Sequence, residues 1–329
     1  MKILIRLPNW LGDVVMSTAF VAAVRQLYPL AVVDIIIKRE MEGLASLIPG
    51  INQVHLLNRQ EHSGLRGTFH FGKALRKYHY DIFFNLPHSL SSALLAWMSF
   101  SKKRVGFNKE GAFFLMTDTY KKPLNLHRVD EYLYLLRKFT GKAIPDKQVQ
   151  LSNTKAVIFQ NQSLIINFNS EAESRRMPLD KGRRIINLLL TAFTDVKFIL
   201  IGAPKEIAFI NELISGLHDT SRISNNAGKT DLIGLTQLMA GSKAVLTTDS
   251  GPAHLANALG IPAVVLFGAG NEHNTAPYNK KDLTVIRYGE LVCEPCVRNT
   301  CQLYGIPKCM QLLDELKIIN ALSLYLNHA

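Results

Sequence analysis

Short runs of consecutive apolar residues recur along the chain, each about as long as one β-strand. In the first half, these runs predict strands at 2–6, 32–37 and 81–86, and a helix from about Val14 to Tyr28. The apolar positions are consecutive rather than alternating, which is typical of strands covered on both faces in a parallel sheet. Alternation of such strands with helices indicates an α/β domain.

The second half of the chain repeats this pattern. Its predicted strands lie at 164–168, 196–201, 244–248 and 263–267, with helical stretches such as 182–193 between them. The sequence therefore predicts two doubly wound domains, 1–155 and 156–329. Ligands of such domains bind beyond the carboxyl ends of the parallel strands.

Two segments bear on how the domains are joined. The polar stretch 142–162 is the best candidate for the linker between them. A last helix is predicted at about 311–327, and the sequence leaves open whether it packs back on the first domain.

Charge separates the two halves more sharply than the apolar pattern does. The 329 residues include 38 Lys or Arg and 26 Asp or Glu, which gives a formal net charge of +12. Residues 1–155 carry +11 of this excess and residues 156–329 carry +1. The basic half indicates an acidic partner, and general solubility is the alternative explanation.

Several features predict a cytoplasmic protein. No stretch reaches the roughly 18 uninterrupted apolar residues of a membrane span. Arg6 and Asp13 interrupt the apolar residues near the N-terminus, which a signal peptide would not allow. The four cysteines crowd between 293 and 309 and do not resemble the disulfide framework of a secreted protein.

The first chemical motif, residues 6–16, follows the first predicted strand. Within it, Asp13 stands at the start of the predicted helix. A carboxylate there could act as a general base if it reaches a substrate hydroxyl. The alternative is a plain helix N-cap, where aspartate is favoured.

The second motif, residues 247–260, leads from a buried strand into a helix that Asp249 or Ser250 caps. Backbone N–H groups of Ser250 and Gly251 at this helix start would form an anion site that suits a diphosphate. Asp249 would repel phosphate, so its carboxylate is better suited to a sugar hydroxyl or to orienting the loop. His254 is either a phosphate donor or a structural histidine.

The third motif, residues 169–178, follows the first strand of the second domain. Ser170 offers a hydroxyl, and Arg175 and Arg176 offer forked donors that suit phosphate oxygens. A solvated basic turn is the alternative. The loop 202–206 could border an adenosine ribose, or it could be an ordinary connection between strand and helix.

The fourth motif is an array of cysteines with the spacing C-x2-C-x4-C-x7-C, formed by Cys293, Cys296, Cys301 and Cys309. Such spacing can ligate a structural zinc ion, and an iron–sulfur cluster is a weaker interpretation. Four reduced cysteines that pack a loop are the favoured alternative.

Some familiar motifs are missing from the sequence. It contains no G-x-G-x-x-G after the first strand, no P-loop and no G-x-S-x-G. It also contains no D-x-D pair. This disfavours a sugar transferase that holds its diphosphate through a divalent ion.

Taken together, the motifs resemble the bacterial ADP-heptose:lipopolysaccharide heptosyltransferases of glycosyltransferase family 9, over most of the chain. The run PNWLGD at 8–13 looks most like the heptosyltransferase II branch, and DSGPAH at 249–254 matches the family's most specific signature. The resemblance implies the GT-B fold, with two Rossmann-like domains facing a cleft. It assigns the acceptor to the N-terminal domain and the nucleotide sugar to the C-terminal domain.

The resemblance also implies residue roles. Asp13 becomes the general base for an inverting, metal-independent displacement of ADP by an acceptor hydroxyl. Arg175 stands where a lysine usually grips the phosphates, Ser170 near them, and Thr230 beside the adenine. The loop around diphosphate and heptose aligns with Asp249, Ser250, Gly251 and His254.

The implied partners are ADP-heptose, a lipid A–core acceptor ending in Kdo or heptose, and the anionic inner face of the cytoplasmic membrane. No cofactor and no nucleic acid are implied, and the basic half would serve to capture the acidic glycolipid. Two alternatives stay open. One is a related transferase that uses another nucleotide sugar, and the other is a nucleic-acid-binding protein with a steep salt dependence.

Overall fold

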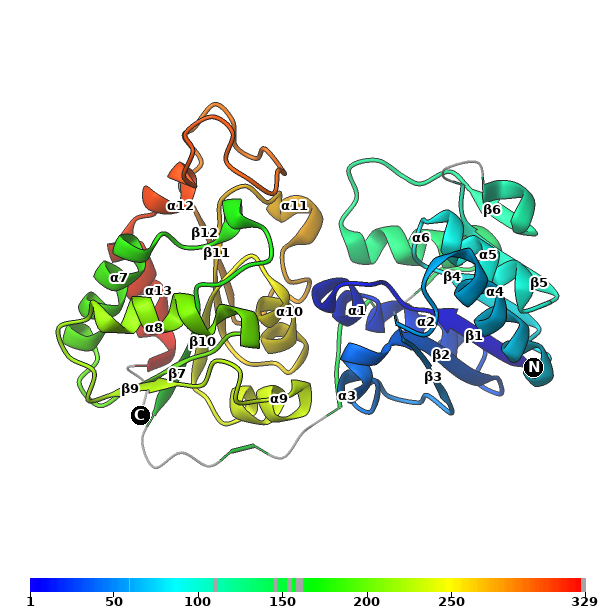
Figure 1. Cartoon of the computed structure of the whole chain (residues 1–329), viewed down its shortest axis with the longest axis horizontal. Coiled ribbons are helices and arrows are strands. Elements are labelled where there is room, and N and C mark those ends of the chain that lie inside the picture. The colour runs from blue at the N-terminus through cyan, green and yellow to red at the C-terminus, as the bar shows by residue number, and fades with distance from the viewer. Residues whose placement is uncertain (59, 109–111, 145–146, 153–155, 158–161, 327–329) are drawn as a thin grey trace. The chain divides into compact units, whose positions relative to one another are not determined.

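The computed structural model divides the chain into two compact units, Met1–Ser152 and Asn153–Ala329 (Figure 1). It describes every residue except 59, 109–111, 145–146, 153–155, 158–161 and 327–329. The expected linker at 142–162 lies partly outside the described residues. The boundary between the units falls within that stretch.

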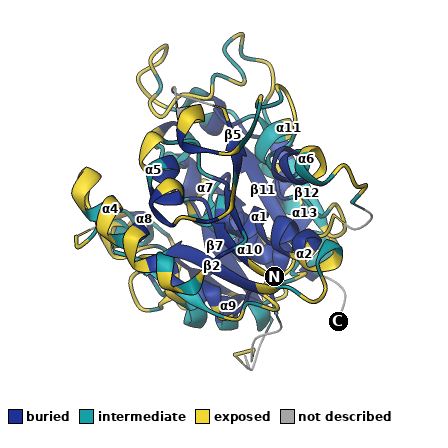
Figure 2. Ribbon diagram, turned by 90° about the vertical axis from the view of Figure 1, so that its right-hand side faces the viewer, coloured by how far each residue is buried: buried dark blue, intermediate teal, exposed yellow. Residues whose placement is uncertain are grey.

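Unit 1 is built on a parallel six-stranded sheet in the order β3-β2-β1-β4-β5-β6. Its strands are β1 (Lys2–Arg6), β2 (Val32–Lys38), β3 (Val54–Leu57), β4 (Ile82–Asn85), β5 (Lys103–Phe107) and β6 (Asp118–Tyr120). The central strands are almost wholly buried because helices cover both faces, as their unbroken apolar runs predict (Figure 2).

The helices of unit 1 connect these strands. They are α1 (Leu11–Met16), α2 (Thr18–Leu27), η1 (Arg39–Met41), α3 (Glu42–Ala45), α4 (Gly64–Ala74), η2 (Leu75–Tyr78), α5 (Leu90–Met98), η3 (Ala112–Leu115) and α6 (Arg128–Thr140). The helix predicted at about 14–28 is present, but it starts three residues earlier, at Leu11, and it is divided into α1 and α2 at Ser17. There the hydroxyls of Ser17 and Thr18 donate to backbone carbonyls three residues back, a pattern that disturbs regular helix.

Unit 2 repeats the architecture with the order β12-β11-β10-β7-β8-β9, again parallel throughout. Its strands are β7 (Ser163–Asn167), β8 (Lys197–Leu200), β9 (Ile223–Asn225), β10 (Ala244–Thr248), β11 (Ala263–Phe267) and β12 (Leu283–Arg287). All five residues of β7, of β10 and of β11 are buried.

The helices of unit 2 include the last helix of the chain. They are η4 (Glu173–Arg175), α7 (Leu179–Ala192), η5 (Pro204–Glu206), α8 (Ile207–Ser215), α9 (Leu232–Ala240), α10 (Gly251–Ala258), α11 (Glu272–Thr275), α12 (Lys308–Gln311) and α13 (Glu315–Leu326). Ile318, Leu322 and Leu326 of α13 belong to the core of unit 2, and α13 packs against α7, β10, β11 and β12. Its apolar face therefore covers the sheet of its own unit.

Both sheets reverse their strand order at one point, between β1 and β4 in unit 1 and between β7 and β10 in unit 2. Parallel strands that lead away in opposite directions leave a crevice beyond their carboxyl ends, and ligands of doubly wound sheets bind there. The loops after β1, β4, β7 and β10 are therefore where chemistry is expected. Among the described residues, no helix is long and apolar enough to cross a membrane.

Candidate active site

Asp13 lies in the first turn of α1, just beyond the carboxyl end of β1. Trp10 occupies the N-cap position of α1, so the interpretation of Asp13 as a plain N-cap is wrong. Nε of Arg128 lies 3.4 Å from Oδ1 of Asp13. Burial raises the pKa of the Asp13 carboxyl, and the charge of Arg128 opposes this rise. The result is a partly buried carboxylate of increased basicity, held beside one guanidinium.

Arg128 is one of three basic side chains gathered around Glu131, which is only 5% exposed. Oε1 of Glu131 lies 3.1 Å from Nη1 of Arg128 and 3.0 Å from Nζ of Lys122. Nε2 of His88 lies 3.2 Å from the same oxygen. Burial opposes ionisation of Glu131, but the hydrogen bond to His88 and the charges of Arg128 and Lys122 lower its pKa. An ionised Glu131 therefore fixes Arg128 in place against Asp13.

This Glu131 cluster (His88, Lys122, Arg128 and Glu131) was missed by sequence reasoning. One signal was available, because residues that follow β4 lie at the same reversal point as residues that follow β1. His88 is such a residue. Its Nδ1 is buried and has no hydrogen-bond partner among the described residues, so this nitrogen can serve a bound substrate.

In unit 2, a network of amides and hydroxyls ties the loop after β7 to the loop after β10. The side-chain amide of Asn167 donates to Oγ1 of Thr247 at 3.1 Å and to Oγ of Ser250 at 2.9 Å. Oγ1 of Thr248 donates to the backbone carbonyl of Asn169 at 2.6 Å. These residues are buried or nearly so, and the network holds the two candidate donor loops in one arrangement.

The start of α10 matches the expectation for the second motif in part. Of the two predicted N-cap candidates, Asp249 and Ser250, the N-cap residue is Ser250, and Gly251 is the first residue of the helix. The Ser250 hydroxyl donates to the carbonyl of Thr248 instead of capping the helix. The N-terminus of α10 therefore carries the partial positive charge that favours an anion. His254 lies buried within this helix.

Asp249 and Arg175 come together at this edge of the sheet. Nη1 of Arg175, from η4, lies 3.3 Å from Oδ2 of Asp249. Asp249 is 3% exposed, and burial raises its pKa to about 6 although Arg175 and Arg287 oppose the rise. Gly270 lies close to Asp249 because it has no side chain. A Cβ at this position would lie 2.0 Å from Oδ2 of Asp249.

Arg287, at the end of β12, shapes the loop that passes Asp249. Its guanidinium donates to the carbonyls of Gly268, at 2.7 Å, and Gly270, and it pairs with Glu272. Sequence reasoning did not single out this arginine. A cation at the carboxyl end of an edge strand was the signal that could have identified it.

The remaining predicted donor residues lie at the same edge of the sheet, beyond the carboxyl ends of their strands. Ser170 is buried after β7, and its carbonyl accepts from Nη2 of Arg176 at 3.3 Å. The guanidinium of Arg176 lies over the ring of Phe209, at 5.6 Å from the centroid, whereas that of Arg175 lies at Asp249. The two arginines of the third motif therefore contact different groups. Thr230 directly precedes Asp231, the N-cap of α9. In the loop 202–206, Lys205 forms an exposed ion pair with Glu171.

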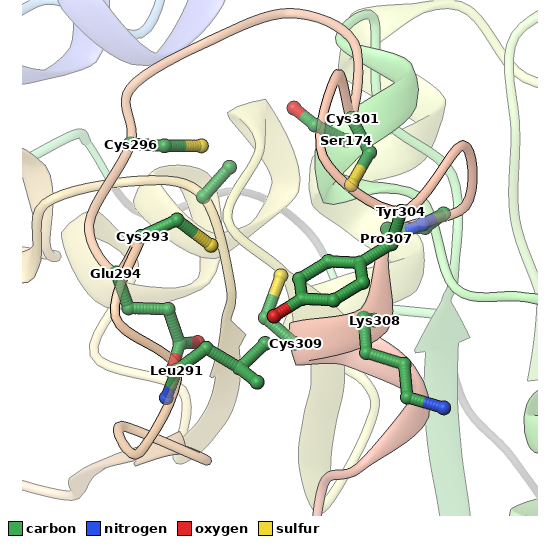
Figure 3. Close-up of a pocket in the computed structure, with 11 residues that line it drawn as sticks. Ser174, Leu291, Cys293, Glu294, Cys296, Cys301, Tyr304, Pro307, Lys308 and Cys309 are labelled. Carbon is green, nitrogen blue, oxygen red and sulfur yellow. The ribbon is translucent and has the colours of Figure 1, made fainter.

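The four cysteines lie around one pocket, together with Ser174, Glu294 and Tyr304 (Figure 3). All four are free thiols, and Cys309 is the buried one. Burial and the nearby Glu294 raise the pKa of the Cys309 thiol to about 11. In the part of the chain that the structure describes, no group of three or more His, Cys, Asp or Glu side chains is arranged to hold a metal ion.

The cysteine-rich loop also forms hydrogen bonds to η4 and to the segment after β11. The backbone N–H of Ser174 donates to the carbonyl of Asn299 at 2.9 Å, and the Ser174 hydroxyl donates to the carbonyl of Arg298. The N–H of Val297 donates to the carbonyl of Ala269 at 2.8 Å. The loop thus braces η4, which carries Arg175, and the segment beside Asp249.

Comparisons with known proteins identify relatives of this chain. Residues 68–306 match the model of glycosyltransferase family 9 (heptosyltransferase). The chain is 26% identical to the lipopolysaccharide core heptosyltransferase OpsX of Haemophilus influenzae over 85% of this chain and 82% of that protein. It is 28% identical to lipopolysaccharide heptosyltransferase 2 of Escherichia coli over 85% of this chain and 86% of that protein.

Solved structures share the fold. The ADP-heptose lps heptosyltransferase II of E. coli superposes with a TM-score of 0.85 at 23% identity, covering 99% of both chains. A family 9 glycosyltransferase of Veillonella parvula has the same TM-score at 18% identity, covering 100% of this chain and 98% of that one. The expected α/β architecture of the GT-B class is thereby confirmed. With a family model that spans most of its length, the chain belongs to glycosyltransferase family 9, the heptosyltransferases.

Proposed function

We propose that this glycosyltransferase moves heptose from ADP-L-glycero-D-manno-heptose onto the inner core of lipopolysaccharide, with inversion and without a metal ion. The observation that carries the proposal is chemical. One unit holds a partly buried carboxylate at its strand-order reversal, and the other holds a helix N-terminus with an arginine at the corresponding place. The names of curated relatives, among them lipopolysaccharide and lipooligosaccharide heptosyltransferases, supply the sugar and the acceptor class.

On the acceptor side, Asp13 takes the proton from the attacking hydroxyl. As that proton moves to the carboxylate, the acceptor oxygen forms a bond to the anomeric carbon of the heptose. The bond from that carbon to the diphosphate oxygen breaks, and ADP leaves with the electron pair. Arg128 keeps Asp13 ionised and oriented, and Glu131 keeps Arg128 in place.

On the donor side, the negative charge that develops on the leaving diphosphate needs stabilisation. Arg175 and the N-terminus of α10, at Ser250 and Gly251, supply it. Asp249 and His254 face the sugar and its phosphate in this proposal. The remaining two predicted residues contribute at the periphery, with Ser170 near the phosphates and Thr230 beside the adenine.

The proposal includes partners and a location. The acceptor is a lipid A–core glycolipid ending in Kdo or heptose, and the enzyme works in the cytoplasm at the inner face of the cytoplasmic membrane. The charge of +12, concentrated in the first half, supports attraction to an acidic glycolipid and to anionic lipid. No cofactor and no nucleic acid take part.

A donor panel tests the proposal against a related transferase that uses another nucleotide sugar. The purified enzyme is incubated with a lipid A–core acceptor and with ADP-heptose, UDP-sugars or GDP-sugars in turn, and nucleotide release is measured. We expect acceptor-dependent release of ADP alone. Release from UDP-sugars or GDP-sugars only would refute the donor assignment.

A further inference from the structure

An apolar surface lies on unit 1, over the elements α4, α5 and η3. We define it as the α4–α5 face, made of Leu65, Phe69, Leu90, Trp97, Phe113 and Phe114. The first two residues come from α4, the next two from α5 and the last two from η3. Each side chain is at least 40% exposed, and Phe114 reaches 68%. Large exposed apolar groups that gather on neighbouring elements mark an interaction site.

The packing of the three elements places these side chains on one surface. The helix α5 contacts both α4 and η3. The two helices pack closely at Gly72 of α4, where an added Cβ would lie 2.6 Å from Cβ of Met98 in α5. Ala93, Leu95 and Ala96 of α5 belong to the core, whereas Leu90 and Trp97, seven residues apart, share an exposed stripe of the helix. Figure 2 shows α4 and α5 with exposed outer surfaces.

Basic residues outnumber acidic ones in the stretch that forms most of this face. Between residues 62 and 108 the sequence has seven Lys or Arg and one acidic residue, Asp81, and two of the lysines, Lys102 and Lys103, pair with Asp81 and Asp118. Arg66 and Lys73 are exposed on α4, in the same helix as Phe69. Arg76, from η2, lies with its guanidinium 3.5 Å from the ring centroid of the exposed Phe100. Cations beside aromatic rings suit a partner that has negatively charged groups at its surface and an apolar layer beneath them.

We propose that the α4–α5 face docks unit 1 on an anionic phospholipid bilayer, with Phe69 and Trp97 entering the interfacial layer and Arg66 and Lys73 contacting the headgroups. This proposal deepens the proposed function, because a lipid-borne acceptor lies in such a bilayer. The charge of the face is what selects a bilayer as its occupant. A second copy of this chain would bring like charges together around the same apolar groups.

Sedimentation of the full-length chain with vesicles tests the docking. We expect binding to vesicles of phosphatidylcholine that contain phosphatidylglycerol, weaker binding to phosphatidylcholine alone, and loss of binding as NaCl increases. The double variant Arg66→Glu with Lys73→Glu should bind the anionic vesicles at least about tenfold more weakly. The double variant Phe69→Ser with Trp97→Ser should lose binding by about tenfold as well.

Matched controls come from unit 2. Lys243→Glu with Lys317→Glu makes the same charge change, and Leu316→Ser with Leu324→Ser makes a comparable apolar change at exposed positions. Both controls should bind vesicles as the unaltered chain does. Thermal unfolding of each variant, measured without vesicles, verifies that all of them are folded.

Three outcomes would overturn the docking proposal. They are equal binding of face variants and controls, no binding of the unaltered chain to anionic vesicles, and a change of oligomeric state in the face variants with unchanged vesicle binding. Transfer to a delipidated, water-soluble core oligosaccharide separates this proposal from the proposed function. The face variants should keep that transfer at the level of the unaltered chain. Its absence in the unaltered chain would count against the function alone.

Discussion

At the scale of single residues, each unit pairs one aspartate with one arginine, and the aspartate is partly buried in unit 1 and buried in unit 2. Burial raises the pKa of Asp13 and of Asp249, and Arg128 or Arg175 opposes the rise. For a general base, a raised pKa increases the driving force for taking a proton. For Asp249, a pKa of about 6 means that its charge diminishes as the pH falls below neutrality. In the proposed function, protonation of Asp249 in mild acid reduces the repulsion between this carboxylate and the diphosphate.

The contact between Arg128 and Asp13 predicts a change in pH dependence. The positive charge of Arg128 lowers the Asp13 pKa, so Arg128→Ala raises it, and the carboxylate is then lost at a higher pH as the solution is acidified. The acid limb of the kcat/KM profile should move up by about one pH unit. Arg128→Lys keeps a cation and should move it less. If the acid limb of the profile stayed at the same pH in Arg128→Ala, Arg128 would not influence the pKa of Asp13.

The position of Arg175 predicts an effect on the donor. Arg175→Ala should raise KM for the nucleotide sugar by about tenfold or more, because a charge-assisted contact to phosphate is worth about 1.5–3 kcal/mol. Lys243→Ala is the matched control, since it removes an exposed cation of unit 2 from a position outside the candidate donor loops. Steady-state kinetics with varied donor gives both values. If the two variants had the same KM, Arg175 would have no special role in phosphate binding.

At the scale of elements, the apolar runs were a good guide to seven of the described strands, did not reveal β3, β5, β6, β9 or β12, and were a poor guide to helix ends. Consecutive apolar residues identify β1, β4, β7 and β10 because strands covered on both faces need them along their whole length. The division of the first helix at Ser17 depends on hydroxyl–carbonyl bonds that no periodicity reveals. The Glu131 cluster was missed for a related reason, since its members come from separate segments that only the fold brings together.

The cysteine-rich loop illustrates the same limit. Its spacing is compatible with zinc, whereas its conformation depends on bonds to η4 and to Ala269. We propose that the four cysteines pack as reduced thiols and that the loop acts as a brace for the donor site. Elemental analysis of the purified enzyme should then find less than about 0.1 zinc or iron per chain, against about one for a tetrahedral thiolate site. A content near one zinc or iron per chain would show instead that the cysteines form a metal site.

At the scale of the whole molecule, the sequence predicted two doubly wound units and an uneven charge, and the resemblance supplied what they bind. The family and the GT-B class are confirmed. The roles of Asp13 and of the donor residues stay predictions, because proximity to a strand end identifies a ligand site without identifying its ligand. The structure places two of the basic residues of unit 1, Arg66 and Lys73, on α4 beside exposed apolar groups, which composition alone could not provide.

The central claim is that this chain adds heptose to the lipopolysaccharide core with Asp13 as the base. The most direct measurement is the mass and anomeric configuration of the acceptor glycan after incubation with ADP-heptose and the purified enzyme. We predict a gain of one heptose in the configuration opposite to that of the donor. We also predict a rate about a thousandfold lower for Asp13→Asn, with donor binding retained. An acceptor of unchanged mass, a retained configuration, or near-normal turnover by Asp13→Asn would contradict the account.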